Sequence, residues 1–174
     1  ENYFIIHGYV SNDRTDYNTL IPVVDKHIKA FGEVLEEVTA DSGYCSEKNL
    51  LYLKQNKITS YIKLQDHEKR KTRAYAEDIS KYYNMTTQVF EDELYYICHD
   101  GRELRHIRTE EKEQDGYTQT LEVYGCADCR GCEHKAKCLY KYNPDKDPDK
   151  NKVMKINEQW EELKEESHAN VQSE

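Results

Sequence analysis

The first third of the chain alternates between short apolar runs and amphipathic stretches. Residues Tyr3–Val10 are rich in β-branched and aromatic side chains, which predicts a strand. From Thr19 to Phe31 apolar residues recur at three- and four-residue steps, which predicts a helix. Thr19 suits its N-cap, Pro22 is tolerated in its first turn, and Gly32 ends it.

Three further elements are predicted before residue 65. A strand runs through Val34–Ala40, a helix extends from about Ser46 to Asn56, and a strand covers Ile58–Ile62. Because strands and helices alternate along the chain, this part predicts an α/β sheet.

From Gln65 the pattern changes. Residues 69–83 read as a polar, basic helix, and residues 156–167 as a final helix. Strands of a small antiparallel sheet are predicted at 86–98, 103–109 and 117–124, with turns at Asp100-Gly101 and Asp115-Gly116. We therefore expect a core over 1–64, an insertion over 65–155, and a helix over 156–174 that leads back toward the core.

Asp41 stands directly after the second predicted strand, with Ser42-Gly43 behind it. In open α/β sheets, reactive groups gather beyond the carboxyl ends of strands. An Asp before Ser-Gly is also a good turn former, because its side chain accepts hydrogen bonds from its own turn. Both readings of Asp41 stay open on the sequence.

Four cysteines are clustered late in the chain: Cys126, Cys129, Cys132 and Cys138. Their spacing suits a structural, tetrahedral zinc site, and Arg130, Lys135 and Lys137 would offset the negative charge of the thiolates. An iron–sulfur site, two disulfides and free thiols are the alternatives, and His134 could replace one cysteine. Cys45 and Cys98 are interpreted as buried small apolar residues.

The net charge of −9 disfavours a simple nucleic-acid-binding module, which usually carries a basic excess. The basic residues are nevertheless concentrated, and this stretch suits either DNA phosphates or an ordinary solvated face: Lys54, Lys57, Lys63, Lys69, Arg70, Lys71 and Arg73. The last helix is acidic, which indicates a solvated face. No apolar run is long enough for a membrane span, and no signal peptide pattern is present.

Several stretches resemble bacterial insertion-sequence transposases of the DDE type, in the branch with a cysteine-rich insertion in the catalytic domain. They are Val38–Asn49, Val10–Asp16, Leu20-Ile21-Pro22, and Cys126–Cys132 with Cys138. The resemblance implies an α/β fold: a partial RNase H-like core, with a mixed sheet and helices, plus a small β-rich insertion that contains a zinc knuckle. It also implies a bacterial, cytoplasmic protein that acts on transposon ends and target DNA, with a homodimer as one assembly of the intact protein.

In that family three carboxylates hold two Mg²⁺ or Mn²⁺ ions for DNA cleavage and strand transfer. Asp41 matches the second acid, so the resemblance makes it catalytic and a Mg²⁺ ligand. We expect the first strand and its Asp to lie before residue 1, and no stretch matches the third acid. By itself the chain is therefore expected to be inactive. The alternatives are a zinc-stabilised interaction module, an inactive domesticated remnant, and a related nuclease.

Overall fold

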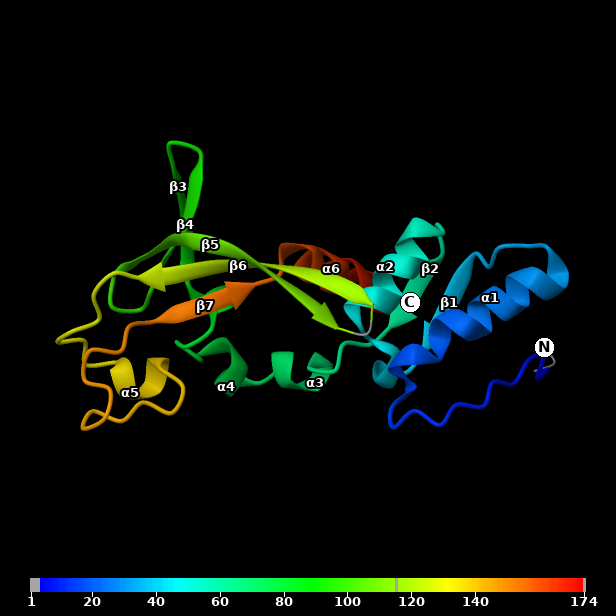
Figure 1. The fold of residues 1–174 in the computed structure, drawn as a ribbon, viewed down its shortest axis with the longest axis horizontal. Coiled ribbons are helices and arrows are strands. Elements are labelled where there is room, and N and C mark those ends of the chain that lie inside the picture. The colour runs from blue at the N-terminus through cyan, green and yellow to red at the C-terminus, as the bar shows by residue number, and fades with distance from the viewer. Residues whose placement is uncertain (1–3, 115, 174) are drawn as a thin grey trace. The chain divides into compact units, whose positions relative to one another are not determined.

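The computed structural model describes residues 4–114 and 116–173. The chain forms two compact units (Figure 1). The first contains the chain up to Glu68 together with the residues from Trp160 onward. The second is the continuous stretch Lys69–Gln159. The first unit is thus built from two segments that are distant in the sequence.

The first unit contains the predicted helix–strand–helix–strand succession. Helix α1 is Leu20–Phe31, with Thr19 and the left-handed Gly32 at its ends. Strand β1 is Glu37–Ala40, helix α2 is Glu47–Gln55, and strand β2 is Thr59–Ile62. β1 and β2 are parallel, so both carboxyl ends lie at the same edge of the two-stranded sheet.

The core of this unit forms between the two helices and the sheet. Leu20 and Val24 of α1 lie in one buried cluster with Leu50 and Leu53 of α2 and Ile62 of β2. Leu53 and Ile62 are fully buried. Leu20 and Val24 of the predicted apolar face therefore pack inward, whereas Phe31 at the end of that face is 54% exposed.

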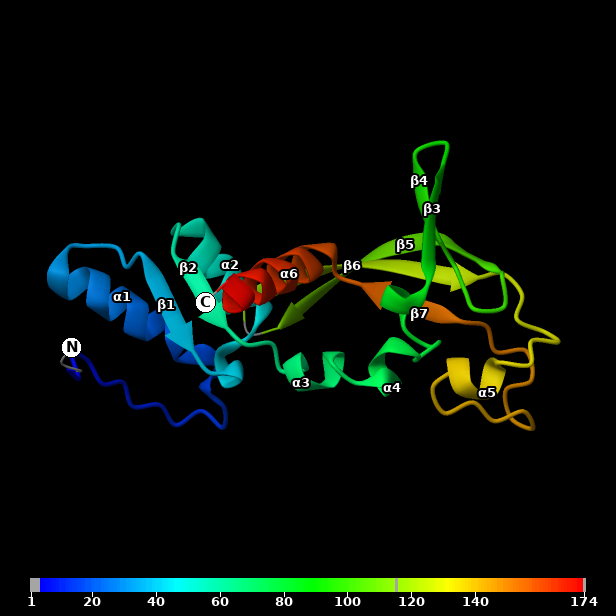
Figure 2. The same ribbon diagram turned by 180° about the vertical axis from the view of Figure 1, so that it is seen from behind.

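Helix α6, Glu158–Ser173, extends the core and covers the free edge of β2 (Figure 2). Its Leu163 belongs to the buried cluster. Ser167 Oγ donates to the backbone oxygen of Ile62 at 2.8 Å, and Asn170 Nδ2 donates to that of Ser60 at 3.2 Å. These polar side chains stand where a further strand would otherwise pair with β2.

The strand expected at Tyr3–Val10 is wrong for the residues that the structure describes. Residues 4–10 form no helix or strand, and Tyr3 lies outside the described residues. Ile5 is 97% exposed and Val10 93%. A β-prone sequence becomes a strand only when another strand accepts its hydrogen bonds, and residues 4–10 have no such pairing here.

The second unit is built on a five-stranded antiparallel sheet in the order β3-β4-β5-β6-β7. The strands are Thr86–Phe90, Glu93–Ile97, Glu103–Gln114, Tyr117–Cys126 and Val153–Ile156. The hairpin of β3 and β4 projects from the rest of this sheet (Figures 1 and 2). β7 was not expected from the sequence, where its stretch had been assigned to a loop and to the start of the last helix.

The single strand expected over 86–98 is a hairpin instead. Glu91 and Asp92 adopt positive φ angles of 51° and 63°, which is the backbone of a tight two-residue turn. The other predicted strands of this sheet are present and extend further than predicted, β5 to Gln114 and β6 to Cys126.

The basic helix expected over 69–83 is also wrong. This stretch contains the short helices α3, His67–Arg70, and α4, Arg73–Ala76, and a 3-10 turn at Tyr82–Asn84. Thr72 interrupts the helix because its hydroxyl donates to Lys69 O at 2.7 Å and accepts from Tyr75 N at 3.2 Å. Such local side-chain bonds compete with the helical pattern.

The remaining helix of the second unit, α5, is Lys135–Cys138 and lies within the cysteine cluster. With one parallel and one antiparallel sheet, the fold is mixed α/β, as predicted at that level. The RNase H-like core and the zinc knuckle remain predictions.

Candidate metal centres

Asp41 lies at the carboxyl end of β1, where the sequence had placed it. It is exposed and N-caps a 3-10 turn over Ser42–Tyr44. Gly43 N donates to Asp41 Oδ1 at 2.7 Å, so one carboxylate oxygen is engaged in its own turn. Asp41 therefore does form a turn, and its second carboxylate oxygen, Oδ2, takes no part in the hydrogen bond from Gly43 N.

Gly43 brings a second carboxylate into the neighbourhood. A methyl group at Gly43 would lie 2.9 Å from Asp41 Oδ1 and 3.9 Å from Asp16 Oδ2. Asp16 and Asp41 thus flank the same glycine, although they are far apart in the sequence. Asp16 belongs to the stretch Val10–Asp16 that resembles the transposases, but the sequence assigned it no role. No local pattern reveals that it lies near Asp41.

The buried side chain of Asn49 fixes the Asp41 turn by hydrogen bonds. Its side chain is fully buried, and Nδ2 donates to Tyr17 O and to Tyr44 O, both at 2.9 Å. Tyr44 belongs to the Asp41 turn, and Tyr17 to the 3-10 turn Asp16–Asn18. One amide group therefore fastens together the two turns that carry the two carboxylates.

The cysteine loop of the second unit begins where β6 ends. Cys126 is the last residue of β6, opposite Leu104 of β5, and its amide donates to Lys152 O at 2.9 Å. Lys152 N in turn donates to Cys129 Sγ at 3.3 Å. Cys138 is the last residue of α5. Backbone N–H groups that donate to sulfur favour the thiolate, the form that binds a metal.

Burial is the main influence on the pKa of three loop thiols, those of Cys126, Cys132 and Cys138. It raises the pKa of Cys126 to about 11, with a hydrogen bond to Cys129 adding to the effect. Burial is also the largest cause that raises the pKa of Cys132 and of Cys138. Near pH 7 these groups are therefore neutral thiols unless a cation stabilises the charged form.

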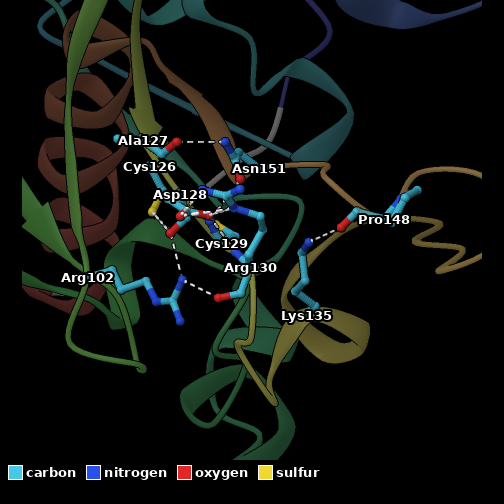
Figure 3. Close-up of polar contacts among 9 residues, drawn as sticks. All are labelled: Arg102, Cys126, Ala127, Asp128, Cys129, Arg130, Lys135, Pro148 and Asn151. Atoms are coloured by element: carbon cyan, nitrogen blue, oxygen red, sulfur yellow. Dashed lines mark hydrogen bonds and ion pairs between the residues drawn. The ribbon is translucent and has the colours of Figure 1, made fainter.

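The cations that face the loop differ from those expected. Arg130 pairs with Asp128 at 2.9 Å, and its hydrogen bonds hold the pKa of Asp128 at about 2. Lys135 Nζ donates to Pro148 O at 2.6 Å. Arg102 instead reaches into the loop, where its Nη1 donates to Asp128 O at 2.7 Å and to Arg130 O at 2.9 Å (Figure 3).

Lys152 is the other cation close to the thiols that the sequence reasoning missed. Its Nζ donates to Ser80 O at 2.6 Å and to Cys138 O at 3.2 Å. Its charge lowers the pKa of the Cys138 thiol against the larger effect of burial. The motif spacing could not reveal Lys152 or Arg102, since both lie outside Cys126–Cys138.

The loop thiols have different partners in the structure, although Cys126 is also hydrogen-bonded to Cys129. Cys126 Sγ donates to Asp128 O at 3.4 Å, and Cys132 is hydrogen-bonded to Asp100. Within 4–114 and 116–173, no three His, Cys, Asp or Glu side chains are gathered as they would be around a metal ion. The donor chemistry suits zinc, since the set is soft, partly buried and close to cations, but the sulfur atoms point to different partners.

Residues 97–174 match the family described as "Transposase DDE domain". This part of the chain is similar to the transposase DDE domain family. The match confirms the expected family, and it contains all four cysteines of the loop but not Asp41. No curated protein and no solved structure matches the chain.

The basic residues expected at DNA are divided between the two units. Lys54, Lys57 and Lys63 belong to the first unit, whereas Lys69, Arg70, Lys71 and Arg73 belong to the second. Lys54 Nζ pairs with Glu166 Oε2 at 2.8 Å, and Arg73 Nε pairs with Glu77 Oε1 at 2.8 Å. Among the described residues, no helix is long and apolar enough to span a membrane.

Proposed function

We propose that this chain is part of the catalytic domain of a DNA transposase, in which Asp41 is one of the metal-binding carboxylates. The observation that carries the proposal is the position of Asp41 at the carboxyl end of β1 in a parallel pair. Reactive groups of open α/β sheets occupy this edge. The transposase match of residues 97–174 supports the same class of reaction.

In this proposal the residues around Asp41 act by fixing its position. The bond from Gly43 N orients Oδ1, and Asn49 anchors the turn to the buried side of the unit. The substrate is DNA, at transposon ends and at a target. Bound Mg²⁺ or Mn²⁺ would supply activation of the attacking oxygen and stabilisation of the leaving oxygen in an in-line displacement.

The second unit, in the same proposal, is an insertion stabilised by a structural zinc ion at the cysteine loop. Cys126, Cys129, Cys132 and Cys138 supply thiols, and Arg102 and Lys152 offset their charge. A stretch with few buried apolar residues gains folding free energy from such an ion. The return of the chain to the first unit from Trp160 onward agrees with an insertion at Lys69–Gln159.

The test of the catalytic assignment is the exchange Asp41→Asn in the full-length transposase. It removes the charge but keeps the shape, so we expect loss of Mn²⁺-dependent nicking of DNA that carries the element's ends. Binding of the same DNA and the melting temperature should change little. The matched control is Asp13→Asn, an exposed acid of the same unit. A fully active Asp41→Asn enzyme would reduce Asp41 to its turn.

The same assay applied to this chain by itself should give no cleavage. Asp41 is the one acid matched to the family's triad, and one carboxylate does not hold two ions about 3.5–4 Å apart. Isothermal titration should accordingly find weak Mg²⁺ binding. Robust metal-dependent cleavage by the chain alone would contradict this assignment of the acids.

A further inference from the structure

Cys98 stands at the turn that joins β4 to β5, outside the cysteine motif. Its amide donates to Arg102 O at 2.9 Å, and its carbonyl oxygen accepts from Gly101 N at 2.9 Å. Gly101, with a φ of 74°, completes the turn. The backbone of Cys98 is therefore fixed in a tight hairpin.

The strand register indicates the face on which the Cys98 side chain lies. Tyr96, Leu104 and Cys126 are opposite one another on β4, β5 and β6. Opposite residues share a face of a sheet, and residues two apart on one strand share it too. Cys98 follows Tyr96 by two positions, and it packs against the buried cluster that contains Cys126 and Cys129.

A clamp fastens this hairpin turn to the cysteine loop. The Arg102 guanidinium donates through Nε to Asp100 Oδ2 at 2.7 Å, within the turn. Through Nη1 it donates to the backbone oxygens of Asp128 and Arg130, within the loop (Figure 3). The His99 and His134 rings also meet, with centroids 4.8 Å apart. Cys98 is thus held beside the loop by contacts on both sides of it in the sequence.

We propose that Cys98 is a ligand of the metal ion at the cysteine loop, where it takes one of the four tetrahedral positions beside three of the four loop thiols. The inference rests on the structural zinc proposed above and adds a ligand from the β4–β5 turn. Zinc–sulfur bonds are about 2.3 Å long, so the thiols turn away from Asp128 and Asp100 when the ion binds. One loop thiol then remains outside the coordination shell.

The experiment measures zinc in the full chain by elemental analysis, and Co²⁺ binding by its thiolate charge-transfer absorption. The unaltered chain should hold about one ion. Cys98→Ser should lose it, as Cys129→Ser does, whereas the control Cys45→Ser, in the core of the other unit, should retain it. Retention of the ion by Cys98→Ser overturns the proposal. An unaltered chain without any ion refutes the zinc site itself, which is a different result.

Two further variants separate ligation from packing. Cys98→Val fills a similar space without a donor atom, and Cys98→His supplies a ring nitrogen that binds zinc or cobalt. We expect the ion to be lost in the Val variant and kept in the His variant, with a weaker charge-transfer band because one thiolate is missing. Retention of the ion by the Val variant, or equal loss in the Val, Ser and His variants, assigns Cys98 a packing role and overturns the proposal.

Discussion

At the scale of single residues, the position of the Asp41 carboxylate depends on two neighbouring residues, Asn49 and Gly43. Asn49 satisfies two backbone oxygens from a site with no exposure to solvent, and Gly43 leaves room for a carboxylate at contact distance. A buried donor that is removed leaves its acceptors unsatisfied, which costs about 1–3 kcal/mol. Side chains that never touch a substrate therefore decide whether Asp41 keeps its geometry.

The exchange Asn49→Asp should be more harmful than its small change in shape suggests. It replaces the donating amide by a carboxylate oxygen that faces Tyr17 O and Tyr44 O in a buried site. We expect the free energy of unfolding to fall by about 3 kcal/mol or more, because a buried charge is left unpaired. Urea denaturation measures it. Asn12→Asp, at an exposed position, is the matched control and should be neutral.

Replacement of Gly43 by alanine tests the close approach. The added methyl would lie 2.9 Å from Asp41 Oδ1, so the carboxylate has to move and the 2.7 Å bond from Gly43 N is lost. Loss of such a cap lowers stability by about 1 kcal/mol. Gly8→Ala, where a methyl meets nothing within 4 Å, is the control for the thermal melts. Equal melting temperatures for the two variants would show that the Asp41 side chain adapts freely.

At the scale of elements, local signals predicted well and distant ones did not. Helices α1 and α2 followed from periodicity, from their caps and from Gly32, all of which act within a few residues. β7 and the unpaired residues 4–10 depend on which strands meet, which no local pattern records. The basic helix failed because one hydroxyl, that of Thr72, changed the hydrogen bonding.

The candidate site divides in the same way. The position of Asp41 after a strand and the spacing of the loop cysteines were readable, since both are local. The approach of Asp16, the anchoring by Asn49, and the roles of Arg102 and Lys152 come from tertiary contacts between separated segments. Cys98 was interpreted as a small apolar residue because nothing within its own stretch relates it to Cys126.

The edge contact of α6 with β2 yields a prediction for a pair of variants. Ser167→Ala and Asn170→Ala remove the donors to Ile62 O and Ser60 O. Each should lower stability by about 1–2 kcal/mol, more for the fully buried Ser167, and amide exchange in β2 should accelerate. Ser173→Ala, whose hydroxyl donates to Asn170 O within α6, is the control. Unchanged exchange in β2 would show that water replaces these donors.

At the scale of the whole molecule, the main question for DNA binding is how an acidic chain would present its basic residues to phosphates. The chain carries −9, yet residues 97–174 match a transposase DDE domain family. Lys54 pairs with Glu166 and Arg73 with Glu77, so these two are less available to phosphates than their sequence suggested. Lys69, Arg70 and Lys71 are three consecutive basic residues at the start of the second unit.

Reversal of charge at Lys69, Arg70 and Lys71 should weaken DNA binding by the full-length protein. Each lost phosphate contact should reduce the slope of log K against log salt concentration by about 0.9, because fewer counterions are released. Fluorescence anisotropy at several salt concentrations gives this slope. The same reversal at Lys141, Lys146 and Lys150, exposed in the same unit, is the control for net charge. An equal slope in both triple variants would return the first set to a plain solvated surface.

The bond from Ser167 to Ile62 joins residues 105 positions apart, and this has a consequence for biosynthesis. On the ribosome, β2 emerges long before α6, and at about 5–20 residues per second the interval is on the order of ten seconds. The continuous stretch Lys69–Gln159 can fold during that interval, while the nascent first unit still lacks its last helix. Until α6 has emerged, the edge of β2 is open to pairing with other chains. A nascent chain stalled before Trp160 should therefore aggregate more readily, or recruit more chaperone, than the finished protein.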